Sequence, residues 1–352
     1  MFSRMTAALQ ALRPRAITQM RKSLADSRTD LRHLSEAVDA LNQSVIALNQ
    51  TLQQQRTEIE RIRTRESQLR VIAKRNIEFA DRERALEAVL NDPSVEGYIR
   101  DRIEHAKLRH DPFPHAVVDK VLPDDVYDAL IAGLPPAELF ADKPPNKQQL
   151  QVPLDLAPNY SRRVWNFLSD VVVRNVFAPA VVEKFKAPLC EWIRQSFSSP
   201  TDDPLTSMQL VSSDGRILLR TRGYHIHPHR DPKWGFITCI LYLARPGDDQ
   251  RWGTDLYEVD EDEEARGAAP HWIDESRCRQ VSTVDFRRNR MFVFLNSAGA
   301  HGARIPEDAE PPTLERYIYQ FRVGPDADSM KALMGSLPPE QRVYWEGKQK
   351  SY

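Results

Sequence analysis

Apolar residues recur every three to four positions through the first 70 residues of the chain, with polar residues between them. This period matches one face of an α-helix. Assigning Leu31 to heptad position a places valine at the later a positions and leucine at the d positions (Val38, Val45; Leu34, Leu41, Leu48). β-Branched residues at a with leucine at d favour a parallel two-stranded coiled coil. The pattern predicts a long coiled-coil helix over residues 1–90 and a dimer.

Three polar residues interrupt this apolar seam, namely Ser27, Gln55 and Glu66. Such interruptions weaken a coiled coil but help to fix its register. The alternative is one long helix that folds back onto the globular part of its own chain, and the sequence leaves both open.

Three short apolar runs in the C-terminal half predict buried strands. The run over residues 235–244 is rich in β-branched and aromatic residues, and residues 290–296 form a second such run. Residues 316–323 form the third, and the period of two in a strand places Arg316, Ile318 and Gln320 on one face.

The remaining segments complete an α+β organisation. Residues 75–110 have a charged helical pattern with a break at Asn91-Asp-Pro and a restart at Ser94. Helical segments between residues 168 and 197 are expected to buttress one sheet. We therefore predict a coiled-coil region (1–90), a helical linker (91–111), a domain of mixed strands and helices (112–325) and a C-terminal helical tail (326–352).

The candidate chemistry lies beside the predicted strands. His229 and Asp231 precede the first strand and are flanked by Pro228 and Pro232, which suits a strand end. His301 follows the second strand and Arg316 opens the third. Two histidines and one carboxylate can occupy one face of an octahedral metal, as in non-haem Fe(II) oxygenases. The planar fork of an arginine suits a carboxylate that binds through two hydrogen bonds.

These residues resemble the 2-oxoglutarate- and Fe(II)-dependent dioxygenases, in their prolyl 4-hydroxylase-like branch. The resemblance covers roughly residues 112–325, and its entry is residues 111–123, a strand followed by a helix start. It is carried most specifically by His229-Arg-Asp231, Thr238-Cys-Ile-Leu-Tyr242-Leu, Gly253-Thr-Asp-Leu-Tyr257 and Arg288-Asn-Arg-Met-Phe-Val-Phe-Leu before His301-Gly. It implies a double-stranded β-helix, or jelly-roll barrel, with buttressing helices.

The resemblance also implies a role for each residue of the site. His229, Asp231 and His301 hold Fe(II), and Arg316 binds the distal carboxylate of 2-oxoglutarate. Many relatives carry serine or threonine two positions after this arginine, where the chain has Ile318. The second hydrogen bond to the co-substrate is then expected from Tyr242, Thr238 or water.

The implied activity is hydroxylation of a substrate with release of succinate and carbon dioxide. A small molecule, a glycan and a protein all remain open as the substrate. Two other classes are compatible with the sequence: a cupin-like metal-binding isomerase or sensor, and a coiled-coil scaffold with a degenerate oxygenase domain.

Several residues compete for the assigned roles. His225 and His227 share the pattern of His229, and a His227/His229 pair would suit a cupin, although no glutamate follows at the usual spacing. We expect His225 and His227 to be exposed or to lie just outside the metal ligands. Arg304 and Arg322 compete with Arg316 for the carboxylate, and Arg322 is expected on the surface at the other end of the barrel.

Composition sets broader bounds. The 352 residues, 41% of them hydrophobic, suffice for one cored domain and an extension, and the net charge of -1 gives no case for a nucleic-acid partner. Three widely spaced cysteines indicate a reducing compartment, so we expect a cytoplasmic protein. No apolar run is long enough to cross a bilayer. The basic first 25 residues leave a transit peptide or membrane-surface helix open, although a plain helical start is expected. The acidic residues 255–264 are expected to form an insertion loop.

Overall fold

The computed structural model describes residues 2–140, 144, 147–197, 203–232, 234–262, 272–339 and 342. The chain forms two compact units, Met1–Leu69 and Arg70–Tyr352. Helix α1 spans Phe2–Leu90, so the long N-terminal helix expected from the heptads is present. Its pairing with a second copy stays a prediction.

The last part of α1 belongs to the second unit. Phe79 and Leu86 are buried there, and the Phe79 ring lies 5.1 Å from that of Tyr160. The backbone N–H of Asn159 donates to Oδ1 of Asn76 over 2.8 Å. The compact unit therefore begins about twenty residues before the predicted domain boundary at residue 90.

The second unit combines helices with antiparallel strands, as the predicted α+β class requires. Its other helices are α2 (Ser94–His105), α3 (Asp124–Ala132), α4 (Asn159–Asn166), the π-helical η2 (Phe167–Phe177), α5 (Ala178–Lys184), α6 (Lys186–Phe197) and α7 (Ala327–Gly335), with short turns η1 (Ala137–Phe140), η3 (Pro204–Ser207) and η5 (Glu275–Arg277). Its strands are β1 (Leu108–Arg109), β2 (His115–Asp119), β3 (Gln149–Gln151), β4 (Leu210–Thr221), β5 (His225–His229), β6 (Ile237–Tyr242), β7 (Thr254–Val259), β8 (Cys278–Val284), β9 (Arg290–Leu295), β10 (Ala300–Arg304) and β11 (Glu315–Pro325).

The strands form two antiparallel sheets. The larger has the order β1-β2-β9-β6-β11-β4-β3 and the smaller has the order β5-β10-β7-β8. The three apolar runs of the sequence became β6, β9 and β11, which are neighbours at the centre of the larger sheet. The strand predictions are confirmed at these three places.

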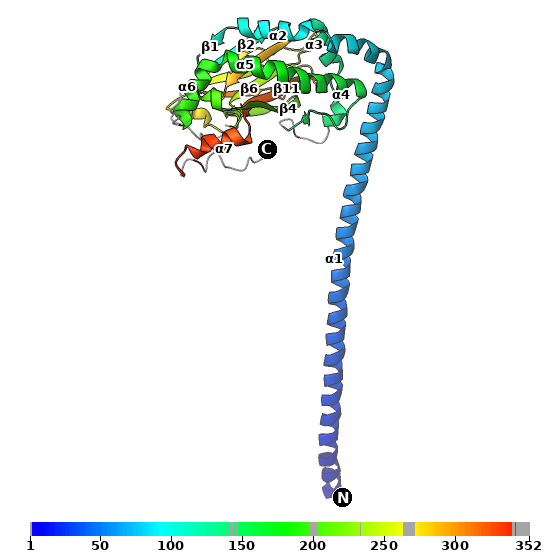
Figure 1. Ribbon diagram of the computed structural model, residues 1–352. Coiled ribbons are helices and arrows are strands. Elements are labelled where there is room, and N and C mark those ends of the chain that lie inside the picture. The colour runs from blue at the N-terminus through cyan, green and yellow to red at the C-terminus, as the bar shows by residue number, and fades with distance from the viewer. Residues whose placement is uncertain are drawn as a thin grey trace. The chain divides into compact units, whose positions relative to one another are not determined.

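Alternate residues of the larger sheet pack in two directions, as the strand period requires. Ile240 and Tyr242 of β6 share one apolar cluster with Leu256 and Val284 of the smaller sheet. Their neighbours on the strand, including Cys239, join a second cluster with residues of α2, α3, η2, α5 and α6. The central sheet thus lies between a helical layer and the smaller sheet, and Figure 1 shows helices beside β6 and β11.

One expectation is wrong here. Residues 255–259 lie in β7, paired with β8, rather than in an insertion loop. Thr254 and Leu256 are buried and the acidic Asp255 between them is not, which is the alternation of a strand. The high charge of the segment obscured this pattern in the sequence. Residues 263 and 264 lie outside the described residues. No helix among the described residues is long and apolar enough to span a membrane.

Candidate metal centre

The two sheets bring His229, Asp231 and His301 together. His229 is the last residue of β5, Asp231 follows it in the connection to β6, and His301 is the second residue of β10. Because β5 and β10 pair in antiparallel register, His229 and His301 lie directly opposite each other. One ligand atom from each of the three side chains lies within 4.8 Å of the others, and all three residues are buried.

The tautomer of His229 follows from its hydrogen bond. Nδ1 of His229 lies 2.8 Å from the backbone oxygen of His227, which can only accept, so Nδ1 carries the proton. Nε2 is then left with its lone pair, 4.0 Å from Oδ1 of Asp231. A histidine held in this way is oriented as a metal-binding histidine usually is. The rings of Trp272 and His301 lie 5.2 and 4.2 Å from the His229 ring and limit its rotation.

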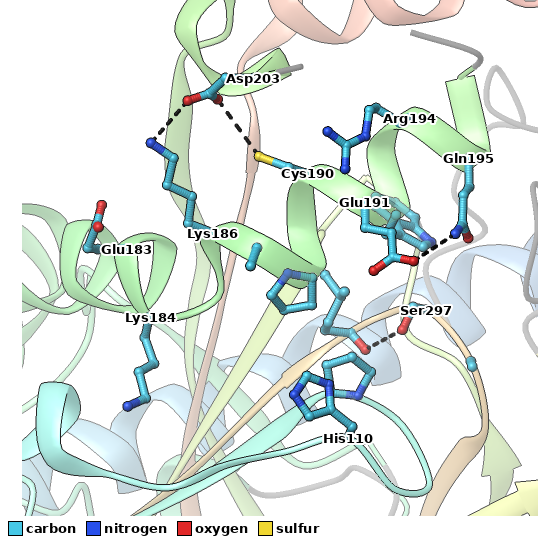
Figure 2. Close-up of a pocket in the computed structure, with 16 residues that line it drawn as sticks. His110, Glu183, Lys184, Lys186, Cys190, Glu191, Arg194, Gln195, Asp203 and Ser297 are labelled. Atoms are coloured by element: carbon cyan, nitrogen blue, oxygen red, sulfur yellow. Dashed lines mark hydrogen bonds and ion pairs between the residues drawn. The ribbon is translucent and has the colours of Figure 1, made fainter. Parts of the chain in front are cut away.

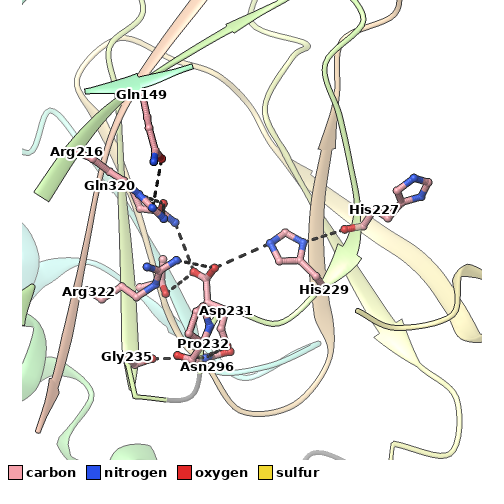
Figure 3. A network of polar contacts seen from close by, with 11 residues as sticks. Gln149, Arg216, His227, His229, Asp231, Pro232, Gly235, Asn296, Gln320 and Arg322 are labelled. Carbon is pink, nitrogen blue, oxygen red and sulfur yellow. Dashed lines mark hydrogen bonds and ion pairs between the residues drawn. The ribbon is translucent and has the colours of Figure 1, made fainter. Parts of the chain in front are cut away.

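The carboxylate of Asp231 is surrounded by donors. Thr238 Oγ1 donates to Oδ2 over 2.7 Å, and Gln320 Nε2 lies 3.5 Å from the same oxygen. Arg322 Nη2 donates to Oδ1 over 2.9 Å. Figure 3 shows this network continuing through Gln320 and Arg216 toward β3. Burial raises the pKa of Asp231, but the positive charge and hydrogen bond of Arg322, with the charge that His301 and His229 carry when protonated, hold the pKa below its usual value. The carboxylate is therefore ionised.

The expectation for Arg322 is wrong, because this residue is buried beside Asp231. In the antiparallel register of β6 and β11, Arg322 pairs with Thr238, which also contacts Asp231. The end of β11 therefore lies at the candidate metal centre rather than on the surface.

Arg316 is buried at the opposite end of the same strand. Its guanidinium forms no ion pair with any described residue, and its Nε has no hydrogen-bond acceptor there. The guanidinium carbon lies 5.6 and 5.1 Å from the ring centres of Tyr242 and Phe286. Burial lowers the pKa of Arg316, and the register places Arg220 directly opposite it. A buried guanidinium in such surroundings is costly unless an anion joins it.

The hydroxyl groups expected near the co-substrate have protein partners. Tyr242 donates to Oγ1 of Thr254 over 2.8 Å, and burial raises its pKa to about 12. Thr238 donates to Asp231. Tyr242 thus lies near Arg316, and its hydrogen bond to a co-substrate stays a prediction. Thr238 is instead a hydrogen-bond partner of the candidate metal ligand Asp231.

The competing residues occupy other places. His225 and His227 are exposed, as expected, and both lie beside Glu275. Arg304 is exposed at the end of β10. Among the three arginines considered for the carboxylate, Arg316 is therefore the one that is buried and lacks a carboxylate partner within the described part of the chain.

Two supporting residues were not predicted. Asn296 is buried after β9, and its side-chain amide donates to the backbone oxygens of Asp231 and Pro232, which fixes the connection carrying Asp231. Arg230 donates from Nε to the backbone oxygen of Gly299 over 2.8 Å and pairs with Asp262. In the sequence, the position of the polar Asn296 directly after the apolar run 291–295 is the signal that could have identified it.

The connection between β9 and β10 requires glycine at position 299. Its φ is +65°, and a Cβ there would lie 2.5 Å from the ring of Phe113. Its N–H donates to Oδ2 of Asp262 over 2.9 Å. The tight turn delivers His301 to the centre two residues later.

A separate groove lies beside α5 and α6, with a volume of about 850 Å³ (Figure 2). Ser297 and Ala298, shortly before His301, line one side of it. The triad residues are not in its lining, and the lining lysines have protein partners: Lys186 pairs with Asp203 at 3.0 Å, and Lys184 donates to the backbone oxygen of Glu104. The groove adds no candidate chemistry to the centre.

No protein-family model matches this sequence, and a search of curated proteins found no match either. Several solved structures resemble the fold. HygX from Streptomyces hygroscopicus, crystallised with nickel and 2-oxoglutarate, is 14% identical, with a TM-score of 0.36 over 66% of this chain and 87% of its own. AviO1 from Streptomyces viridochromogenes is also 14% identical, with a TM-score of 0.36 over 67% of this chain and 98% of its own.

A prolyl 4-hydroxylase from Pseudomonas putida is 11% identical, with a TM-score of 0.34 over 64% of this chain and 93% of its own. These similarities are distant, so the case for a function rests on the residues of the site.

Proposed function

We propose that this protein is an Fe(II)- and 2-oxoglutarate-dependent dioxygenase that hydroxylates a substrate within a jelly-roll formed by its two sheets. The observation that carries the proposal is a buried two-histidine, one-carboxylate group on the same sheet system as a buried arginine without a carboxylate partner among the described residues. The first feature suits a metal and the second suits an anionic co-substrate.

His229, Asp231 and His301 are the proposed metal ligands. Two imidazole nitrogens and one carboxylate oxygen form the donor set that suits Fe(II) and leaves positions open on one side. The hydrogen bond from Nδ1 of His229 and those to Asp231 would orient these ligands before the metal arrives. When bound, Fe(II) would activate dioxygen together with 2-oxoglutarate, which is converted to succinate and carbon dioxide as the substrate is hydroxylated.

Arg316 is the proposed partner of the distal carboxylate of 2-oxoglutarate. A dianion would supply the counter-charge that the buried guanidinium lacks among the described residues. Tyr242 lies against the same guanidinium, and rotation of its O–H away from Thr254 would supply a second hydrogen bond. We assign Thr238 to the orientation of Asp231, which it contacts directly.

The test is release of succinate from 2-oxoglutarate by the aerobic Fe(II)-loaded protein. We expect turnover in the wild type, with iron binding lost in His301→Ala and Asp231→Ala. The exposed residue His105, which pairs with Asp101, supplies a control in His105→Ala. A wild-type protein that binds Fe(II) at the triad but leaves 2-oxoglutarate intact would favour a metal-binding isomerase or sensor instead.

We further propose that the N-terminal unit binds a second copy of this chain. Its heptad leucines Leu31, Leu41 and Leu48 are 65%, 64% and 60% exposed, a pattern that a lone helix has no reason to keep. Each such side chain stabilises an assembly by about 1.5–3 kcal/mol when fully buried. The alternation of Val38 and Val45 with these leucines suits a parallel pair of helices.

A further inference from the structure

We infer that His225, His227 and Glu275 form a second metal site, which takes Zn(II) or a similar divalent transition ion. The three residues lie outside the proposed triad. Each offers a ligand atom, and these atoms lie within 4.8 Å of one another. The inference does not depend on the proposed oxygenase activity.

The fold brings these side chains together from two segments, strand β5 and the η5 turn. His225 and His227 are alternate residues of β5 and project to the same side, with ring centres 4.0 Å apart. Glu275 opens the η5 turn, where its Oε1 contacts Nδ1 of His227 and lies 3.9 Å from Nε2 of His225. Ligand atoms about 2.0–2.1 Å from a tetrahedral Zn(II) lie roughly 3.3 Å apart, so small side-chain rotations would admit the ion.

The donors determine the class of metal. Two imidazoles and one carboxylate suit Zn(II), Ni(II) or Cu(II) better than Mg(II) or Ca(II), which prefer oxygen ligands. The side chains of His225, His227 and Glu275 are 41%, 56% and 56% exposed, so solvent reaches the site and water can fill the fourth position. Arg304 lies opposite His225 on β10 and is exposed, which lets solvent screen its charge.

A metal at this site would hold in place the segment that packs against His229. Trp272 forms a bridge with His229 and packs against its ring, and the N–H of Ile273 donates to the backbone oxygen of Pro228 over 3.2 Å. Glu275 follows two residues later in the same segment. A metal between Glu275 and β5 would therefore hold Trp272 against His229.

The experiment measures Zn(II) bound per chain, and the hydrogen exchange of residues 272–277, in the full-length protein at micromolar Zn(II). We expect about two equivalents in the wild type, one at each site, and about one in His225→Ala and in Glu275→Gln. Asp231→Ala should lose only the triad equivalent and keep the second. Zn(II) should slow exchange in residues 272–277 of Asp231→Ala, but not in Asp231→Ala combined with His225→Ala.

His105→Ala is the matched control, because His105 is an exposed histidine beside the carboxylate of Asp101, and it should keep both equivalents. The inference is overturned if His225→Ala and Glu275→Gln bind as much Zn(II) as the wild type, which would make the cluster an ion pair only. If the triad binds no Zn(II), whether in Asp231→Ala or in the wild type, the Zn(II) bound by His225, His227 and Glu275 can still be measured. The proposed function and this second metal site can therefore fail independently.

Discussion

Arg322 donates from Nη2 to Oδ1 of Asp231 across 2.9 Å, and both side chains are at most 5% exposed. The guanidinium thus lies against a carboxylate that is also a proposed metal ligand. In the absence of metal, Arg322 supplies the counter-charge that keeps this buried carboxylate ionised. A bound divalent ion would be a second source of positive charge beside the same carboxylate. Arg322 and the metal would therefore both neutralise the charge of Asp231.

Replacing Arg322 by methionine should destabilise the metal-free protein far more than the metal-bound protein. Removing one partner of a buried ion pair typically costs about 3–5 kcal/mol, which corresponds to a fall in Tm on the order of 10 °C. Metal would restore a counter-charge to Asp231, so the rise in Tm on adding Mn(II) should be larger in Arg322→Met than in the wild type. Arg322→Lys, which keeps the charge, is the control. Equal metal-induced shifts in all three proteins would contradict this view.

Arg316→Ala should bind 2-oxoglutarate at least about 30-fold more weakly than the wild type. Removing the charged partner of a buried carboxylate costs roughly 2–5 kcal/mol. Calorimetric titration of the metal-loaded protein measures the loss, and metal content should stay unchanged. Arg304→Ala removes an exposed arginine from the same sheet system and should bind normally. Normal binding by Arg316→Ala would place the carboxylate elsewhere.

Aspartate at both Val38 and Val45 should convert a dimer into a monomer. Both residues are exposed on the isolated helix and occupy a positions of the heptad, so charge there would be buried against the partner helix. Sedimentation at micromolar concentration distinguishes the two states. Gln43→Asp, at an outer heptad position, should leave the dimer intact. A monomeric wild type would instead favour a helix that packs on its own chain.

A chain that starts at Arg70 should fold stably, whereas one that starts at Ser94 should be much weaker. The shorter chain loses Phe79 and Leu86, which are buried in the apolar cluster beneath the larger sheet. Removing large buried side chains costs about 2–5 kcal/mol each. Chemical unfolding of both chains measures the difference. Equal stability would show that the end of α1 contributes little to the compact unit.

The sequence was most informative where local pattern and chemistry coincide. Strands β6, β9 and β11 were predicted because their residues are apolar and β-branched, and the candidate ligands adjoin them. His229, Asp231 and His301 converge because β5 and β10 are neighbours, and sequence proximity to predicted strands was enough to suggest it.

The environment of Asp231 could not be obtained in the same way. It depends on the register that places Arg322 opposite Thr238, and a strand pattern alone does not fix register between strands distant in sequence. The sequence also does not show that Phe79 and Leu86 pack within the compact unit that begins at Arg70, because they continue a helical pattern without revealing which residues cover them. The surroundings of Asp231 and the packing at the end of α1 both depend on contacts between residues far apart in the sequence.

The most direct test is a crystal structure of the full-length protein with Mn(II) and 2-oxoglutarate, prepared without oxygen. The proposed function predicts metal bound by His229, Asp231 and His301, with the distal carboxylate of 2-oxoglutarate on the guanidinium of Arg316. Metal bound elsewhere with the triad unoccupied, or a carboxylate held away from Arg316, would contradict it.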